Sequence, residues 1–361
     1  MGESLWELAY VLPNLNLSEC FQCSQMALVP AKDPRVQQIE EAIPSARKLL
    51  HAFVDMTGQA IEPAVLLIHP EAPASAVTAE ALVAFRNMVA LSIQLREWAH
   101  VRKQGQPEHP LFSDSFDFYP VTMADQDHLV ILSPALQAIV TLEAPFQGMA
   151  APHVPRFYHQ RYGLDFILYE GLRLHWERRF AENNEERETR VIFRSLEMAY
   201  HASSVPLKNQ ANLFDYGLYL SIWVSAMEIL VHPKKRTASQ EQVLRLLGSF
   251  SWNDSRLNQE KFEIVLNREY QYVNLIQKLY KEIYRARGYF LHGNPVKEES
   301  LYPFGNTKYP DLWSLAPLVY RTALLAYLQE LHPHFAVVWP SEVWELAQLE
   351  YEDALLQLIQ T

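Results

Sequence analysis

The sequence predicts a mainly α-helical protein of two domains, an α+β domain over residues 1–183 and a helical domain over 184–361. The chain has 361 residues, more than one typical domain needs and enough to bury a large core. Its composition, 49% hydrophobic and 20% charged, is that of an ordinary folded protein. Glycine is scarce, with 11 residues, whereas 22 prolines mark many element ends. Together these features favour helix over sheet.

The net charge of −11 limits the classes of partner. A strongly acidic chain repels polyanions at long range, so indiscriminate nucleic-acid binding is excluded and any RNA site must be a local basic patch. The N-terminus carries Glu3 and Glu7 and has no basic start before an apolar run, so we expect no signal peptide. We also expect no bilayer-spanning stretch, no membrane partner and a cytoplasmic location.

The N-terminal residues 1–33 contain many turn formers and are interpreted as an arm or a strand-containing cap. A helix is predicted over 34–56, with a kink or break at Pro44. The clearest helix of this half covers 77–104, where apolar residues recur at helical spacing and are expected to pack into a core. They are Ala81, Leu82, Phe85, Val89, Ile93 and Trp98.

A small antiparallel sheet is predicted next. Three short runs over 113–121, Leu129–Leu132 and Ala138–Leu142 are rich in aromatic and β-branched residues and are separated by turn formers. We expect this to be the only appreciable sheet, confined to 110–145.

Two groups of candidate metal ligands occur in the first domain, and neither predicts a metal site. Cys20 and Cys23 form an isolated Cys-x-x-Cys pair without a second pair nearby, so we interpret them as reduced, structurally ordinary cysteines. Four aspartates could bind a hard cation, but their spacing fits no calcium loop, and solvated turn carboxylates are the better interpretation. These are Asp114, Asp117, Asp125 and Asp127.

The proline-rich stretch 143–155 reads as a connector, and 161–180 as a further helix. The polar run 181–190 places the domain boundary near residue 183. Beyond it, apolar spacing predicts a bundle of helices, with Pro317 in the first turn of its helix, where a missing amide is harmless. The predicted helices are 191–201, 216–231, 240–247, 259–285 and 317–331, followed by an amphipathic tail over 341–360.

The stretch Leu279–Pro295 carries the strongest functional signal. Leu279, Ile283 and Ala286 recur at the spacing of a helix with one buried stripe. Gly293 supplies a left-handed residue to end that helix, and the following proline stops it from continuing. His292 is therefore expected at the helix C-terminus.

A histidine in this position can exchange protons near neutral pH. The last carbonyls of the helix favour a cation there, whereas burial disfavours one. Arg285 lies seven residues before His292, which on an ideal helix is nearly the same face. Arg287 lies five residues before, so pairing it with His292 requires the final turn to unwind. Arg194 and His201 repeat the seven-residue spacing elsewhere.

The chain resembles the HEPN superfamily at these residues. Tyr284, Arg287, His292 and Gly293 match the tyrosine, arginine, histidine and glycine of its arginine–histidine motif, most closely that of the Apea-like branch. The stretch Tyr219–Pro233 resembles the tryptophan-containing helix of that branch, with Trp223 and Glu228 in the corresponding places. The resemblance covers residues 188–332.

The resemblance implies an antiparallel helical bundle without paired strands inside 216–331. It further implies a homodimer that brings two motifs around one cleft, and a metal-independent endoribonuclease, such as a toxin or defence effector, that uses no cofactor. RNA carries its own nucleophile, the 2′-hydroxyl, so the site needs proton transfer and positive charge. His292 would be general base or acid, Arg287 would stabilise charge, and Glu228 would orient Arg287.

Further RNA contacts are predicted for Tyr284, Arg285 and the basic cluster Lys234, Lys235 and Arg236, although such clusters are commonly solvated loops. The alternative is a non-catalytic RNA-binding or protein-interaction module. In that case Arg287 forms a salt bridge with Glu228 and His292 caps carbonyl groups. No phosphate-binding glycine loop, dinucleotide fingerprint or nucleophile motif is present.

Overall fold

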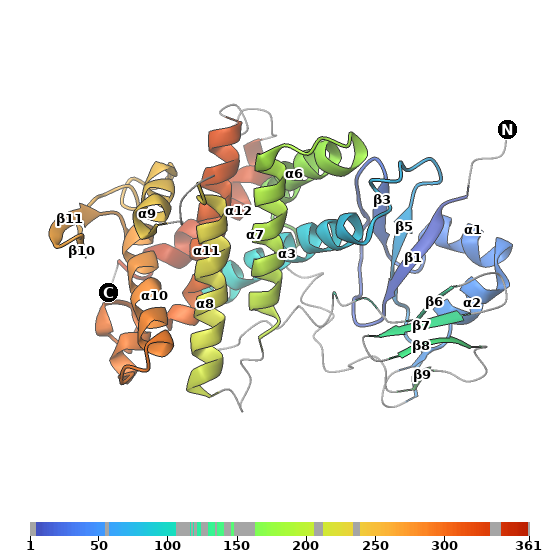
Figure 1. Ribbon diagram of the computed structural model, residues 1–361, viewed down its shortest axis with the longest axis horizontal. Coiled ribbons are helices and arrows are strands. Elements are labelled where there is room, and N and C mark those ends of the chain that lie inside the picture. The colour runs from blue at the N-terminus through green and yellow to red at the C-terminus, as the bar shows by residue number, and fades with distance from the viewer. Residues whose placement is uncertain are drawn as a thin grey trace. The chain divides into compact units, whose positions relative to one another are not determined.

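The computed structural model describes most of the chain and divides it into two compact units, each described by itself (Figure 1). For the strands within 121–147 and for residues 341–346, the structure describes the backbone only. The described residues are 5–54, 58–105, 116, 118, 121–123, 129–133, 136–140, 146–147, 163–205, 212–233, 239–332 and 341–359. The first unit comprises Met1–Ala90, Phe112–Gly163 and His175–Asn184, and the second Leu91–Leu111, Leu164–Leu174 and Glu185–Thr361.

The first unit contains an antiparallel four-stranded sheet in the order β1-β5-β3-β2. All five residues of the inner strand β5 are buried, and prolines at 63 and 70 flank it. The core beneath this sheet includes Val11, Val29, Val65 and Leu67. The strands are β1 (Glu7–Leu12), β2 (Phe21–Gln22), β3 (Met26–Val29) and β5 (Ala64–Ile68).

Two short helices complete that core. Helix α1 (Pro34–Ala42) is capped by the Asp33 side chain, and α2 (Pro44–Leu50) begins directly after the residue that ends α1. The predicted break at Pro44 is therefore confirmed. The helix ends earlier than predicted, at Leu50, because the chain then enters strand β4 (Phe53–Val54).

A second sheet of the first unit lies where the sequence predicted one. Strands β6 (Val121–Met123), β7 (Leu129–Ser133) and β8 (Leu136–Val140) pair antiparallel in that order. A parallel pair joins β4 to β9 (Phe146–Gln147). The prediction of a small antiparallel sheet is confirmed, but the prediction that it would be the only one is wrong, since the four-stranded sheet lies within residues 7–68.

Two helices contribute residues to both units. Helix α3 (Ala79–Lys103) matches the predicted helix over 77–104. Helix α6 (Phe166–Trp176) continues as a π-helix over Glu177–Ala181. The main segment of the second unit begins at Glu185, close to the predicted boundary, but this unit also takes in 91–111 and 164–174, which the sequence assigned to the first domain.

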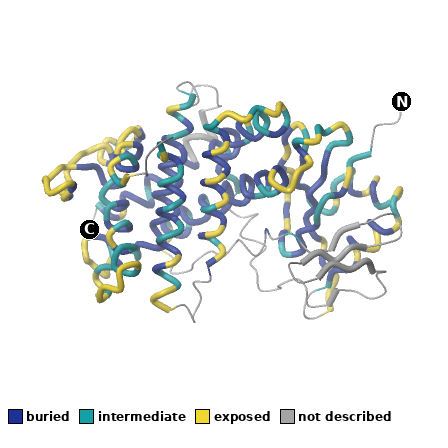
Figure 2. Tube along the Cα trace, in the orientation of Figure 1, coloured by how far each residue is buried: buried dark blue, intermediate teal, exposed yellow. Residues whose placement is uncertain are grey.

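The second unit is a helical bundle in which α8 packs against α7, α10 and α11. Its two central helices, α8 and α11, are rich in buried apolar residues (Figure 2). The helices are α7 (Arg187–Ser203), α8 (Leu213–Leu230), α9 (Gln240–Ser249), α10 (Leu275–Leu291), α11 (Leu312–Leu331) and α12 (Ser341–Leu356).

The prediction of one helix over 259–285 is wrong for its first half. Residues Phe262–Leu266 form β10 and Glu269–Val273 form β11, an antiparallel hairpin that is exposed along much of its length (Figure 2). Asn267 and Arg268 both have positive φ, as a tight two-residue hairpin turn requires. These paired strands lie inside 216–331, so they contradict what the HEPN resemblance implied for that range.

The position of Pro317 also differs from the prediction. Helix α11 begins at Leu312, capped by the Asp311 side chain, so Pro317 lies inside the helix rather than in its first turn. Proline has no amide to donate, so the carbonyl of Trp313 lacks its helical donor.

The sequence predicts no bilayer-spanning stretch, but helix α8 is long and apolar enough to span one by length and composition alone. It has 18 residues, a mean hydropathy of 1.2 and 44% of its length buried within the protein. Core helices of other proteins pass the same test of length and composition.

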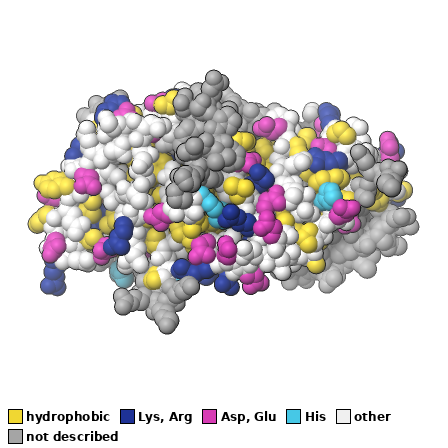
Figure 3. Space-filling model, turned by 90° about the horizontal axis from the view of Figure 1, so that it is seen from above, with side chains coloured by type: hydrophobic (Ala, Val, Ile, Leu, Met, Phe, Trp, Pro, Cys, Tyr) yellow, Lys and Arg dark blue, Asp and Glu magenta, His cyan; other side chains and the backbone are white. Residues whose placement is uncertain are grey.

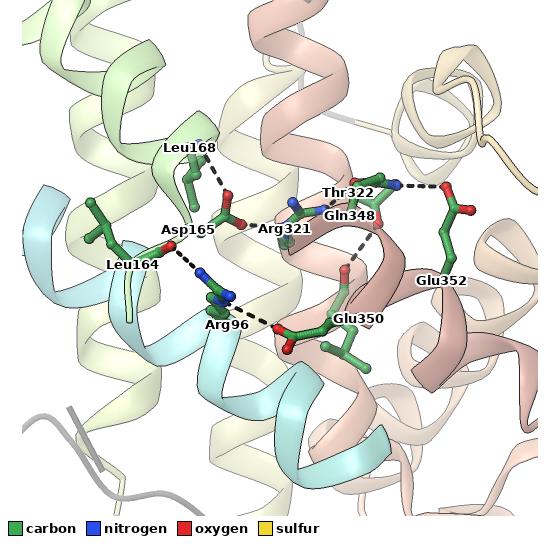
Figure 4. A network of polar contacts seen from close by, with 10 residues as sticks. Arg96, Leu164, Asp165, Leu168, Arg321, Thr322, Gln348, Glu350 and Glu352 are labelled. Carbon is green, nitrogen blue, oxygen red and sulfur yellow. Dashed lines mark hydrogen bonds and ion pairs between the residues drawn. The ribbon is translucent and has the colours of Figure 1, made fainter. Parts of the chain in front are cut away.

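A buried polar network joins separate segments of the second unit (Figure 4). The fully buried Arg321 of α11 donates from Nε to Asp165 Oδ2 at 2.6 Å and from Nη1 to Gln348 Oε1 at 2.9 Å. Gln348 in turn donates to Glu352, whose two oxygens accept the amides of Asn253 and Asp254. One arginine therefore holds α11, α12 and the start of α6 together.

Candidate functional site

The site that the sequence singled out is the C-terminal end of α10. The helix starts with a capping box between Asn274 and Gln277, in which each side chain bonds the other's backbone amide. It stays helical to Leu291, and His292 is its C-cap. Gly293 follows with φ +64°, so the predicted left-handed terminator is confirmed.

Arg287 reaches away from this end of the helix. Its Nη1 lies 3.6 Å from Glu228 Oε1 of α8, and its guanidinium lies 5.4 Å from the ring centroid of Tyr284, one turn earlier. Side chains of a helix tilt toward its N-terminus, so this direction is the favoured one. The unwinding that would bring Arg287 to His292 does not occur, since α10 is regular to Leu291.

The carboxylate of Glu228 is partly buried. Burial raises the pKa of Glu228, and the positive charge of Arg287 opposes the rise. The neighbouring Tyr280 is buried, and burial together with the charge of Glu228 raises the pKa of its hydroxyl well above the ordinary value. Arg287 therefore neutralises a partly buried carboxylate, which is a structural role.

Replacing Arg287 with alanine is expected to lower the free energy of unfolding by about 1 kcal/mol at pH 7. The Glu228 pKa is already raised in the folded state, so its ionised form costs stability as pH rises above the ordinary carboxyl pKa, and losing Arg287 enlarges that cost. Below that pKa the carboxyl is neutral in both states, so the loss should shrink toward pH 4. Urea denaturation at both pH values measures it.

The matched control is Arg285→Ala. Arg285 is exposed and forms no ion pair with any residue that the structure describes, so its loss should change stability by less than about 0.5 kcal/mol. A pH-independent loss at Arg287 would contradict the account of Glu228.

His292 and Arg285 lie on a different face of α10 from Arg287. Lys278, Lys281, Arg285 and His292 follow one another at steps of three, four and seven residues, which places them within an arc of about 60° on the helix. We call these four side chains the α10 cationic stripe. His292 and Arg285 are exposed, and within the described residues the His292 side chain has no hydrogen-bond partner.

The charges of the α10 cationic stripe are only partly compensated. Lys278 pairs with Glu282 at 3.4 Å, and Lys281 donates to the neutral Gln240 at 2.8 Å. Burial, followed by the charges of Arg285 and Lys278, lowers the pKa of Lys281. The two neighbouring cations add to the effect of burial, so positive charges lie close together here on a protein of net charge −11.

An apolar patch lies near the C-terminal end of α10, where that helix meets the start of α8. Phe290 packs so closely on Gly217 that a Cβ there would lie 2.5 Å from its ring, which fixes the end of α10 against the start of α8. The large apolar side chains around this contact are unusually exposed. They are Leu213, Phe214, Leu218 and Leu291, with exposed fractions of 50%, 83%, 53% and 57%, and we call them the α8–α10 apolar patch.

The other candidates from the sequence lie on other elements or outside the described residues. Lys234, Lys235 and Arg236 lie outside the described residues. Arg194 and His201 are both exposed on α7. Within the described residues neither Cys20 nor Cys23 forms a disulfide, and no group of histidine, cysteine and acidic side chains there could hold a metal ion.

Sequence reasoning identified Arg285 and His292 but missed Lys278 and Lys281. The signal was present, because all four share the helical spacing of one face. Comparison with protein-family models, with curated proteins and with solved structures yields no match.

Proposed function

We propose that the helical unit binds single-stranded RNA along the α10 cationic stripe. The observation that carries the proposal is geometric: Arg285 and His292 are exposed on one face of α10 without an ion-pair partner among the described residues, and the nearby Lys281 bonds only the neutral Gln240. Cations on one helix face can follow the phosphates of a nucleic-acid strand. The partly exposed ring of Tyr284, the residue before Arg285, could stack on a base.

The rest of the surface is consistent with a local site. On the face seen in Figure 3, basic and acidic side chains are interspersed rather than segregated. A protein of this net charge repels RNA at long range, so binding must come from short-range contacts. The ion pair of Arg287 with Glu228 keeps the arginine of the resemblance motif away from His292 in a single chain, which favours binding over cleavage.

Arg285→Ala is expected to weaken binding of a single-stranded RNA about fivefold, because it removes a charge-assisted bond to phosphate worth about 1 kcal/mol. Fluorescence anisotropy measures the affinity. Arg245→Ala is the matched control, since Arg245 is an exposed arginine of α9 whose partner is the surface residue Glu241. Equal losses in both variants, or no loss in either, would refute the stripe as the RNA site.

A second candidate function is a metal-independent endoribonuclease, favoured by the exposed His292, whose side chain has no partner among the residues that the structure describes. Cleavage by the 2′-hydroxyl would proceed in a chelator, leave 2′,3′-cyclic phosphate ends and spare DNA. Such a site needs a second proton carrier. A second copy of the chain would supply it.

A homodimer for this second candidate would cover the α8–α10 apolar patch. Exposed apolar residues of this size commonly mark an interface, and the patch ends at Leu291, next to His292. Light scattering should then give the mass of a dimer. A monomer at all concentrations, with and without RNA, would leave the binding function alone. Membership of the HEPN superfamily stays a prediction, against which the β10–β11 hairpin counts.

A further inference from the structure

A second basic site lies at the start of α7, apart from the α10 cationic stripe. A groove of about 510 Å³ runs between the first turns of α7 and the end of α8. Three arginines of α7, Arg187, Arg190 and Arg194, line it together with His232. Because the arginines are three and four residues apart, they share one helix face.

The three arginines do not stabilise the start of α7. Arg187 is the first residue of α7, and Arg190 lies within its first turns. The partial positive charge of a helix N-terminus disfavours cations. Only one acidic residue, Glu188, lies in the first turn to offset them, and Glu186 forms no side-chain cap.

The groove has one fixed cation and two free ones. Arg187 donates to the backbone carbonyl of His232, which joins the start of α7 to the end of α8. Arg190 and Arg194 are exposed, and neither forms an ion pair or hydrogen bond from its side chain within the described part of the chain. Two guanidinium groups without a partner in the described part of the chain, beside a held one, can converge on one anion.

The basic and apolar residues that line the groove indicate which ligand it would bind. Three arginines and a histidine around one compact groove exceed the single charge of a phosphodiester and suit a phosphate monoester, which carries about −1.5 to −2 at pH 7. Guanidinium groups bind phosphate oxygens bidentately. The apolar side chains of Val191, Ile229 and Pro233 line the rest of the groove, which suits a sugar or base next to the phosphate.

We propose that this groove binds the phosphorylated 5′ end of an RNA, with Arg190 and Arg194 on the phosphate and the terminal nucleotide against the apolar wall. The proposal rests on the proposed function, in that the same chain binds RNA. It adds a preference between RNA ends that the α10 cationic stripe alone does not give.

The test compares two RNAs of one sequence, one with a 5′-phosphate and one with a 5′-hydroxyl, binding to the full chain in chelator. Anisotropy of a 3′ label reports both affinities. The wild-type protein should bind the phosphorylated RNA about tenfold more tightly, since charge-assisted bonds are lost with the phosphate. In the double variant Arg190→Ala, Arg194→Ala the ratio should fall to about one, and in Arg245→Ala it should stay at the wild-type value.

The outcomes separate the two proposals. Equal binding of both RNAs by the wild-type protein overturns the 5′-end site while leaving the RNA function standing, and binding of neither overturns both. An unchanged ratio in the double variant also overturns this site. Inorganic phosphate and adenosine monophosphate serve as competitors. If either one binds the wild-type protein as tightly as the phosphorylated RNA does, the ligand is a free phosphate compound and the RNA assignment is wrong.

Discussion

Arg321→Ala is expected to lower the free energy of unfolding by about 3–5 kcal/mol, the largest stability loss that we predict for a single side chain of this protein. Arg321 and Asp165 are both fully buried and 2.6 Å apart. Removing the guanidinium leaves the Asp165 carboxylate without its counter-charge in a site that water does not reach. It also removes the donor to Gln348 and the cation that lies 3.5 Å from the ring centroid of Tyr351. Urea denaturation followed by circular dichroism measures the loss.

A double variant separates charge from packing in this network. Asp165 also caps α6 by accepting the Leu168 amide, and asparagine caps a helix equally well. Asp165→Asn with Arg321→Met therefore removes both charges and keeps the cap. Because apolar replacement of a whole buried ion pair is often neutral, the double variant should recover most of the loss. A loss below about 1 kcal/mol in Arg321→Ala would show that the pair is unimportant.

His292→Ala is expected to slow RNA cleavage about 10²- to 10⁴-fold if the protein is a nuclease, because it removes one proton-transfer partner. The fold should survive, since His292 is exposed and follows the last helical residue of α10. Cleavage of a labelled RNA in chelator, with the melting temperature as a control, measures this effect.

The two arginines of the motif should differ in the same assay. The sequence preferred Arg287 as the charge-stabilising residue, but the structure places Arg285 on the face of His292 and pairs Arg287 with Glu228. Arg285→Ala should therefore slow cleavage more than Arg287→Ala, which should mainly lower stability. Suppose that none of the three substitutions alters RNA binding or cleavage, and that those at Arg287 and His292 lower the melting temperature. The motif is then a structural salt bridge and cap.

Several elements could be predicted because local signals agreed with the final packing. Helix α3 has a continuous apolar series, and Pro44 separates α1 from α2 as its geometry requires. Strands β7 and β8 are short β-branched runs next to turn formers. Gly293 ends α10 in the left-handed conformation that glycine favours.

Other elements differ from the prediction because a strand or capping signal outweighs the helical spacing of apolar residues there. The run of β5 is fully apolar between two prolines, which is typical of a buried strand. Polar and apolar residues alternate over Glu269–Tyr272 of β11, just after Asn267, and the Asn274–Gln277 capping box marks the true start of α10. These period-two and capping signals outweigh the scattered helical spacing over 259–274.

The site was predictable only in part. Helix periodicity placed His292 at the end of a helix and Arg285 on its face, and the structure confirms both positions. Periodicity could not show that Glu228 of α8 lies opposite Arg287, since that contact joins residues 59 positions apart through tertiary packing. The groove beside Arg190 likewise depends on how α7 meets the end of α8.

The salt dependence of RNA binding tests the central claim, that the α10 cationic stripe contacts RNA phosphates, most directly. Each phosphate contact to single-stranded RNA contributes about 0.7 to the slope of log affinity against log salt concentration. The double variant Lys281→Gln, Arg285→Gln should therefore reduce the magnitude of the slope by about 1.4 relative to the wild-type protein, while Arg245→Ala leaves it unchanged. An identical slope in the double variant and the wild-type protein would contradict the account.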